Sequence, residues 1–129
     1  MAKHNDIGQR GEQLAADYLI QKNYTILDRN WRYGRAEIDI VAMNGSTLVF
    51  AEVKTRSDDL FERPESAVDD KKRRLLTRAA VAYMRKIGHE WAIRFDILAV
   101  VLKHFSEKTE TDIFFIDHFE DAFFPRLAD

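Results

Sequence analysis

Residues 37–56, EIDIVAMNGSTLVFAEVKTR, decide the fold predicted for this chain of 129 residues. Two runs rich in β-branched and aromatic residues flank Asn44 and Gly45. This pair tolerates positive φ and is typical of two-residue hairpin turns. A loop of these two residues would place Asp39 opposite Phe50. We therefore expect a β-hairpin in this register.

The hairpin has two unlike faces, because successive side chains along a strand alternate between faces. One face is expected to be apolar throughout: Ile38, Ile40, Ala42, Val49, Ala51 and Val53. The other is expected to be apolar near the turn and charged at its open end: Glu37, Asp39, Val41, Leu48, Phe50, Glu52 and Lys54. The pattern predicts a core around the turn and a polar cluster at the open end.

The charged end of the hairpin has the composition of a metal site. Asp39 and Glu52 would be diagonal neighbours with backbones roughly 7 Å apart. Carboxylates crowded beside apolar surface repel unless a cation or raised pKa values relieve them, and Mg²⁺ or Mn²⁺ prefers oxygen ligands. Lys54 would add an ammonium suited to an attacked phosphate. The alternative is an edge hairpin whose charged end is simply solvated, and this pattern alone leaves both open.

Two sets of residues resemble known proteins. Asp39, followed thirteen residues later by Glu52, Val53 and Lys54, resembles the D…(D/E)xK signature of restriction-endonuclease-like nucleases. A larger ordered set resembles the YraN family, small bacterial proteins classed as predicted endonucleases related to Holliday-junction resolvases. That set is Gly8, Gly11, Glu12, Tyr18, Leu19, Arg29, Asn30, Glu37, Asp39, Phe50, Glu52, Lys54, Thr55 and Arg56. The likeness extends over about residues 8–123 and departs from the family at Asn23 and Ala36, where Gly is common.

The resemblance implies a restriction-endonuclease-like core and a Mg²⁺- or Mn²⁺-dependent endonuclease that hydrolyses DNA, including branched or Holliday-junction DNA. Asp39 and Glu52 would hold the metal, joined by the backbone carbonyl of Val53. Lys54 would position the attacking water or stabilise the transition state, and Glu12 would complete the acidic cluster. Position alone gives Glu12 another interpretation, a solvated residue favoured near a helix N-terminus.

The order of elements predicts an α/β fold with a mixed β-sheet of about five strands flanked by two main helices, forming a single domain over residues 1–129. Asn5 or Asp6 is the expected N-cap of the first helix, and Gly8 and Gly11 are expected where that helix approaches the sheet closely. The predicted elements are a helix at 6–22, a strand at 24–32, a polar turn at 33–35, the hairpin, a loop at 55–64, a helix at 65–87 ended by Gly88, a strand at 91–102, a polar turn at 103–112 and a strand at 113–118.

Basic residues near the hairpin are candidates for binding nucleic acid. These are Arg29, Arg32, Arg35, Arg56, Lys71 and Lys72. The first three have an alternative role, the neutralisation of Glu37 and Glu52. The run at residues 71–74 spans more than one helical turn, so its side chains fan out and a mostly solvated basic face is the favoured interpretation, although Lys71 or Lys72 could still reach nucleic acid.

Composition narrows the functions further. The chain has 20 basic and 22 acidic residues and a net charge of −2, so any nucleic-acid surface must be local. The absence of cysteine excludes thiol catalysis and zinc-thiolate sites. The four histidines lack metal-ligand spacing. With no apolar run of membrane-spanning length, we expect a cytoplasmic protein without a membrane partner.

A second class of function fits the same residues. A non-catalytic nucleic-acid-binding or partner-docking module with a nuclease-like fold is favoured by the small size and the low positive charge. RNA as the substrate also stays open. An enzyme that cuts junctions would need two sites, which a homodimer would supply.

Overall fold

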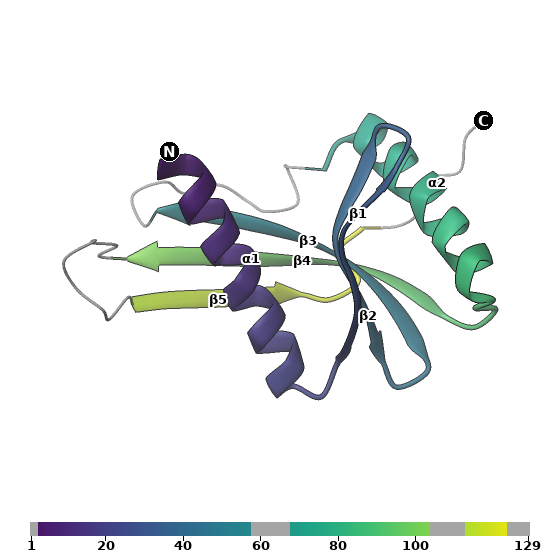
Figure 1. Ribbon diagram of the computed structural model, residues 1–129, viewed down its shortest axis with the longest axis horizontal. Helices are drawn as coiled ribbons and strands as arrows, with labels where there is room; N and C mark the ends of the chain where they lie inside the picture. The colour runs from purple at the N-terminus through teal and green to yellow at the C-terminus, as the bar shows by residue number, and fades with distance from the viewer. Residues whose placement is uncertain (1–2, 58–67, 104–112, 124–129) are drawn as a thin grey trace.

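The computed structural model describes residues 3–57, 68–103 and 113–123 and has the predicted order of elements (Figure 1). These are α1 (Lys3–Gln21), β1 (Thr25–Tyr33), β2 (Ala36–Asn44), β3 (Thr47–Ser57), α2 (Asp70–Ile87), β4 (Ile93–Lys103) and β5 (Ile113–Phe119). The structure thus confirms an α/β protein with a restriction-endonuclease-like core of five strands and two helices. None of the described helices is long and apolar enough to cross a membrane.

The five strands form one mixed sheet in the order β1-β2-β3-β4-β5. Neighbouring strands are antiparallel except β3 and β4, which are parallel. A parallel pair needs a long crossover, and α2 lies in that connection. β4 is an interior strand, between β3 and β5.

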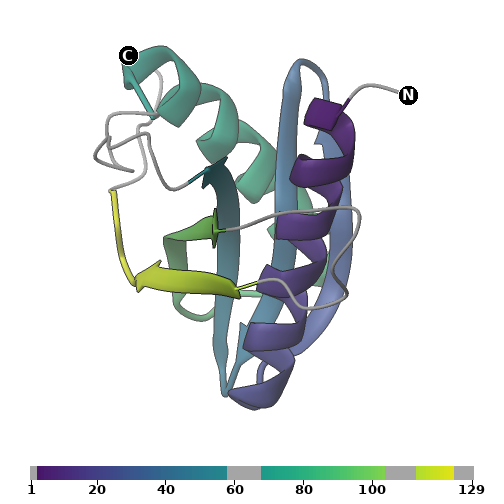
Figure 2. The same ribbon diagram turned by 90° about the vertical axis from the view of Figure 1, so that its left-hand side faces the viewer.

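The two helices cover opposite faces of the sheet, as Figures 1 and 2 show. Under α1, a cluster is built from Ala15, Ala16, Leu19, Tyr24, Ile40, Ala42, Val49, Ala51, Leu98 and Val100. Under α2, the larger cluster contains Ile38, Val41, Leu48, Phe50, Leu76, Ala79, Ala80, Tyr83, Phe95 and Ile97. Burial of these two apolar layers fixes which face of each strand meets which helix.

The central hairpin is confirmed, but its turn lies one residue further along than predicted. Gly45 and Ser46 close the turn, Gly45 with φ +62°, and Asn44 pairs with Thr47. The predicted pairing of Asp39 with Phe50 is therefore wrong, because Phe50 opposes Val41. Compared with the predicted register, each residue of β2 faces a β3 residue two positions further along the chain. A shift by two positions does not change which face of the sheet a side chain is on, so Val41 and Phe50 still share a face.

The predicted alternation fails at Ile38. Ile40 packs under α1 as expected, whereas Ile38 packs under α2. Asn30 of β1 lies between the residue pairs Arg29–Ile40 and Trp31–Ile38 and has φ +52°. Close to Asp39, the regular alternation of side chains between the two faces of the sheet is therefore interrupted in both strands. A prediction that assumes strict alternation cannot locate this interruption.

The helix ends differ from prediction at their N-termini. α1 begins at Lys3, so Asn5 and Asp6 lie inside it and neither is its cap. α2 begins at Asp70, so residues 68 and 69 of the predicted helix lie before it, and the Asp69 side chain caps it by accepting a hydrogen bond of 2.8 Å from the backbone N–H of Lys72. The predicted helical residues 65–67 lie outside the described residues. Gly88 ends α2 in the left-handed conformation, as predicted.

The close approach of α1 to the sheet holds for one of the two predicted glycines. A Cβ added to Gly11 would lie 1.9 Å from Thr55 Oγ1, whereas a Cβ at Gly8 would have no neighbour within 4 Å. The predicted loop at 55–64 begins later, because β3 continues to Ser57. Residues 58–67 and 104–112, in which the rest of both predicted loops falls, lie outside the described residues.

Candidate active site

The site forms where the sheet divides between β2 and β3. The pairing of these strands ends at Ile40 and Ala51. Beyond that point β2 continues beside β1, and β3 continues beside β4. Figure 1 shows the strands diverging from this fork. Asp39 and Glu52 are the first residues past the last pair, so the fold brings both to the opening of the fork.

The division of the sheet leaves backbone groups of β3 without a strand partner. The N–H of Val53 donates to Asp39 Oδ2 at 2.8 Å, so a carboxylate replaces the missing strand. The N–H and C=O of one strand residue point toward the same neighbouring strand. The Val53 carbonyl, predicted as a metal ligand, therefore faces the same opening as Asp39.

Glu52 is the most unusual side chain of the site. It is 14% exposed, and its Oε2 lies 3.4 Å from Lys72 Nζ. Its Oε1 is buried and has no hydrogen-bond partner. Buried carboxylate oxygens are normally satisfied, so the unsatisfied oxygen makes Glu52 a candidate ligand for a cation.

The carboxyls of Asp39 and Glu52 are hard to ionise together. Burial raises the pKa of Glu52 to about 8, and the nearby Asp39 carboxylate adds to the effect, while Lys72 opposes it. Burial also raises the pKa of Asp39 to about 6, with further increases from Glu12 and Glu37, against the hydrogen bond from Val53. The two carboxyls titrate as a pair, and a divalent cation between them would relieve both the repulsion and the burial cost.

These residues line one pocket of about 360 Å³, comparable with the smaller ligand sites of proteins. Its lining residues are Glu12, Arg35, Glu37, Asp39, Glu52, Val53, Lys54, Val68, Lys72 and Ile97. The four residues predicted to be catalytic, Glu12, Asp39, Glu52 and Lys54, are thus brought together. Among the residues with described placement, however, no three His, Cys, Asp or Glu side chains already form a group able to hold a metal.

Glu12 reaches the pocket from α1. The close packing of Gly11 on Thr55 brings this turn of the helix next to β3. The Glu12 carboxylate accepts a hydrogen bond of 3.0 Å from Asn30 Nδ2, and its charge acts on Asp39. Its position in the acidic cluster, which the family resemblance implied, therefore agrees with the geometry.

The six basic candidates do not form one surface. Arg35 and Lys72 line the pocket. Arg32 forms an ion pair with Glu37 at 3.0 Å, the neutralising role that the sequence had left open, and Arg29 donates to Gln13 of α1 at 2.9 Å. Of the other two, Lys71 is exposed on α2 and Arg56 is half-buried on β3, and neither lines the pocket.

Sequence reasoning missed the ion pair of Lys72 with Glu52. It is set by the start of α2, where the Asp69 cap turns the first helical residues toward the fork. The apolar part of the pocket lining, Val68 and Ile97, was missed as well. The Asp69 capping signal was the only local sign of either feature.

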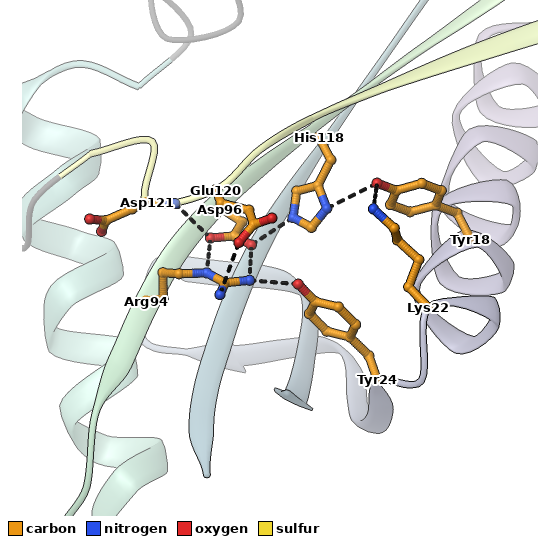
Figure 3. A network of polar contacts seen from close by, with 8 residues as sticks. All are labelled: Tyr18, Lys22, Tyr24, Arg94, Asp96, His118, Glu120 and Asp121. Atoms are coloured by element: carbon orange, nitrogen blue, oxygen red, sulfur yellow. Dashed lines mark hydrogen bonds and ion pairs between the residues drawn. The ribbon is translucent and has the colours of Figure 1, made fainter. Parts of the chain in front are cut away.

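A second polar cluster, shown in Figure 3, ties α1 to β4 and β5. Asp96 is fully buried and forms an ion pair of 2.8 Å with Arg94. His118 contacts Asp96 at 2.7 Å and Tyr18 at 3.2 Å, and Arg94 donates to Tyr24 at 2.6 Å. Burial raises the pKa of Asp96, but the hydrogen bonds from His118, Arg94 and the Asp121 backbone outweigh it and hold that pKa below its ordinary value. The cluster is internally satisfied and is best explained as structural.

The fold and the pocket define a restriction-endonuclease-like α/β protein with a paired-carboxylate pocket at the fork of its sheet. The chain belongs to the family described as "Uncharacterised protein family UPF0102", whose model matches residues 11–100. UPF0102 proteins of Phocaeicola vulgatus and Bacteroides thetaiotaomicron are each 46% identical over 127 residues, covering 98% of this chain and 99% of theirs. A UPF0102 protein of Parabacteroides distasonis is 44% identical over 124 residues, covering 96% and 97%. These matches confirm the family likeness that the sequence motifs indicated.

Proposed function

We propose that this protein is a Mg²⁺- or Mn²⁺-dependent endonuclease that hydrolyses phosphodiester bonds of DNA, with branched DNA as its preferred substrate. The observation that carries the proposal is the convergence of Asp39 and Glu52 at the fork, with Lys54 lining the same pocket. Buried, mutually repelling carboxyls are costly, and such groups gather where function requires them.

The residues of the fork fit a hard divalent cation. Asp39, Glu52 and the Val53 carbonyl would hold it, and the buried, unpartnered Oε1 of Glu52 supports this assignment. A bound Mg²⁺ supplies Lewis acidity and a water of lowered pKa. The oxygen ligands are few, which leaves coordination positions for water and substrate.

The remaining residues of the pocket have distinct tasks in this proposal. Lys54 would orient the attacking water or stabilise charge on the phosphate. Lys72 holds Oε2 of Glu52 and so leaves its other oxygen directed to the ligand. Arg35, which lines the same pocket, would contact a substrate phosphate.

A cleavage assay on linear, flapped and four-way-junction DNA with Mn²⁺ tests the proposal. Asp39→Asn and Lys54→Ala should each lower the rate by at least about 100-fold, while circular dichroism shows an intact fold. Asp17→Asn removes an exposed carboxylate of α1 outside the pocket and is the matched control. Wild-type cleavage rates in either pocket variant would refute the assignment.

The competing function, a non-catalytic nucleic-acid-binding module, is favoured by one observation. The described part of the chain holds no ready group of three metal-binding side chains. Binding of the same DNAs that weakens with salt, without any cutting, would select this alternative. Sizing of the protein with and without junction DNA would test the homodimer that two coordinated cuts require.

A further inference from the structure

We propose that a groove next to the pocket binds one unpaired nucleotide of a DNA strand, with its base stacked on Tyr33. This groove, called here the Tyr33 groove, is lined by Tyr33, Gly34, Arg35, Leu75 and Arg78 and has a volume of about 340 Å³. The inference rests on the proposed function, since it extends the path of the substrate strand beyond the cleavage site.

The aromatic platform for the base is the Tyr33 ring, which is exposed to solvent and packs against rings that continue into the core. Tyr33 is 51% exposed and lies nearly parallel to Trp31, with an interplanar angle of 11° and ring centroids 6.1 Å apart. Trp31 meets Tyr83 edge to face at 5.0 Å, and Tyr83 meets Phe50 in the same way at 6.1 Å. The ring of Tyr33 is therefore the outermost member of a series that is anchored in the core, so little order must be gained on binding.

The charge of the Tyr33 groove suits a polyanion. Arg35 and Arg78 line it, and its described lining includes no carboxylate. Leu75 adds apolar surface for a base. Arginine beside an aromatic ring is the usual combination for single-stranded nucleic acid, because the ring takes the base and the guanidinium takes the phosphate.

The Tyr33 groove and the candidate active site share one lining residue, Arg35. A strand whose phosphate is held at the fork would thus have an adjoining nucleotide within reach of Tyr33. The side chain of Arg35 would contact the phosphate between the two positions.

The platform also selects the kind of DNA. Both faces of a base inside a duplex are covered by its neighbours, so a surface tyrosine can stack only on a base that has left the helix. Flaps, overhangs and branch points offer such bases, whereas uninterrupted duplex does not. The substrate class is therefore DNA with an unpaired nucleotide beside the scissile bond.

Fluorescence anisotropy in EDTA tests this inference without cleavage. The probes are a labelled duplex with a single-stranded overhang and a blunt duplex of the same paired sequence. Tyr33→Ala should weaken binding of the overhang DNA about tenfold, the loss expected for one stacked base, and change blunt-duplex binding less than twofold. Tyr33→Phe should bind as wild type does. Trp91→Ala removes an aromatic residue that is 68% exposed and lies outside the groove, and it should have no effect.

The outcomes separate this inference from the proposed function. Equal loss for both DNAs, no loss in Tyr33→Ala, or a wild-type protein that binds neither DNA would overturn the Tyr33 groove. Cleavage with Mn²⁺ by wild type, measured separately, decides the nuclease proposal. If wild type cleaves DNA but Tyr33→Ala still prefers the overhang DNA, only the proposal for the Tyr33 groove is refuted. If Tyr33→Ala loses that preference but wild type does not cleave, only the nuclease proposal is refuted.

Discussion

Replacing Glu52 by Gln is expected to stabilise the metal-free protein at neutral and alkaline pH. Burial and the Asp39 carboxylate raise the pKa of Glu52 from its ordinary 4.5 to about 8. A carboxyl whose pKa is raised by folding contributes stability that is fully present below its unfolded pKa and is lost as pH rises through its folded pKa. Wild type should therefore lose stability between about pH 4.5 and 8, whereas the variant should lose only the smaller amount that comes from Asp39, whose pKa is raised to about 6.

The size of the effect follows from the same interval. At pH 7 the unfolded chain has ionised Glu52 while the folded chain keeps it protonated. Each pH unit between 4.5 and 7 then costs the folded wild type about 1.4 kcal/mol, which amounts to about 3 kcal/mol. The protonated carboxyl forms no ion pair with Lys72 at this pH, so replacement by Gln loses none, and the influence of Lys72 is already contained in the pKa of about 8. The variant should gain about 3 kcal/mol at pH 7 and less than about 1 kcal/mol at pH 5.

Urea denaturation in EDTA at pH 5, 6, 7 and 8 measures the difference in the free energy of unfolding. Glu90→Gln makes the same chemical change at an exposed position and should follow wild type at every pH. A Glu52→Gln variant that is less stable than wild type at pH 8, or whose gain is the same at pH 5 and pH 8, would refute the reasoning on burial and repulsion.

Three further predictions follow from the structure. Millimolar Mg²⁺ or Mn²⁺ should raise the melting temperature of wild type in calorimetry by several degrees through mass action, but not that of the Glu52 variant; equal shifts would place the metal elsewhere. Gly11→Ala should lower the free energy of unfolding, measured by urea denaturation, by about 1–3 kcal/mol because its Cβ meets Thr55. Gly8→Ala, with open space around it, should raise the free energy of unfolding by about 0.5–1 kcal/mol. Similar effects at both sites would contradict the packing argument. Asp96→Asn should cost about 3 kcal/mol at pH 7 by breaking a buried ion pair, and because the pKa of Asp96 is lowered, the cost should shrink as pH falls; a constant cost at all pH values would exclude a charge effect.

Much of the fold was predictable because its determinants are local. Asn44 and Gly45 gave the hairpin, Gly88 gave the end of α2, and the apolar runs gave the order of elements. The turn was placed one residue early because both Asn44 and Gly45 accept positive φ, and only Gly45 adopts it. Local preference identified the turn but could not choose between neighbouring registers.

The candidate site was predictable in its residues and not in its surroundings. The spacing of Asp39, Glu52 and Lys54 on one hairpin face placed them together, since strand periodicity is a local rule. The unpartnered oxygen of Glu52 and the apolar contact of Val68 and Ile97 depend on elements far apart in the chain. No periodicity in the hairpin itself could indicate them.

The sequence by itself determined that this chain forms a β-hairpin whose open end carries acids and a lysine, because alternation and turn preference act over a few residues. Only the tertiary structure decided where β2 and β3 separate, that Lys72 reaches Glu52, and that Arg29 contacts Gln13 while Arg32 pairs with Glu37. The physical reason is burial, since α2 and β4 enclose the fork and turn two ordinary carboxyls into a pair that cannot ionise freely.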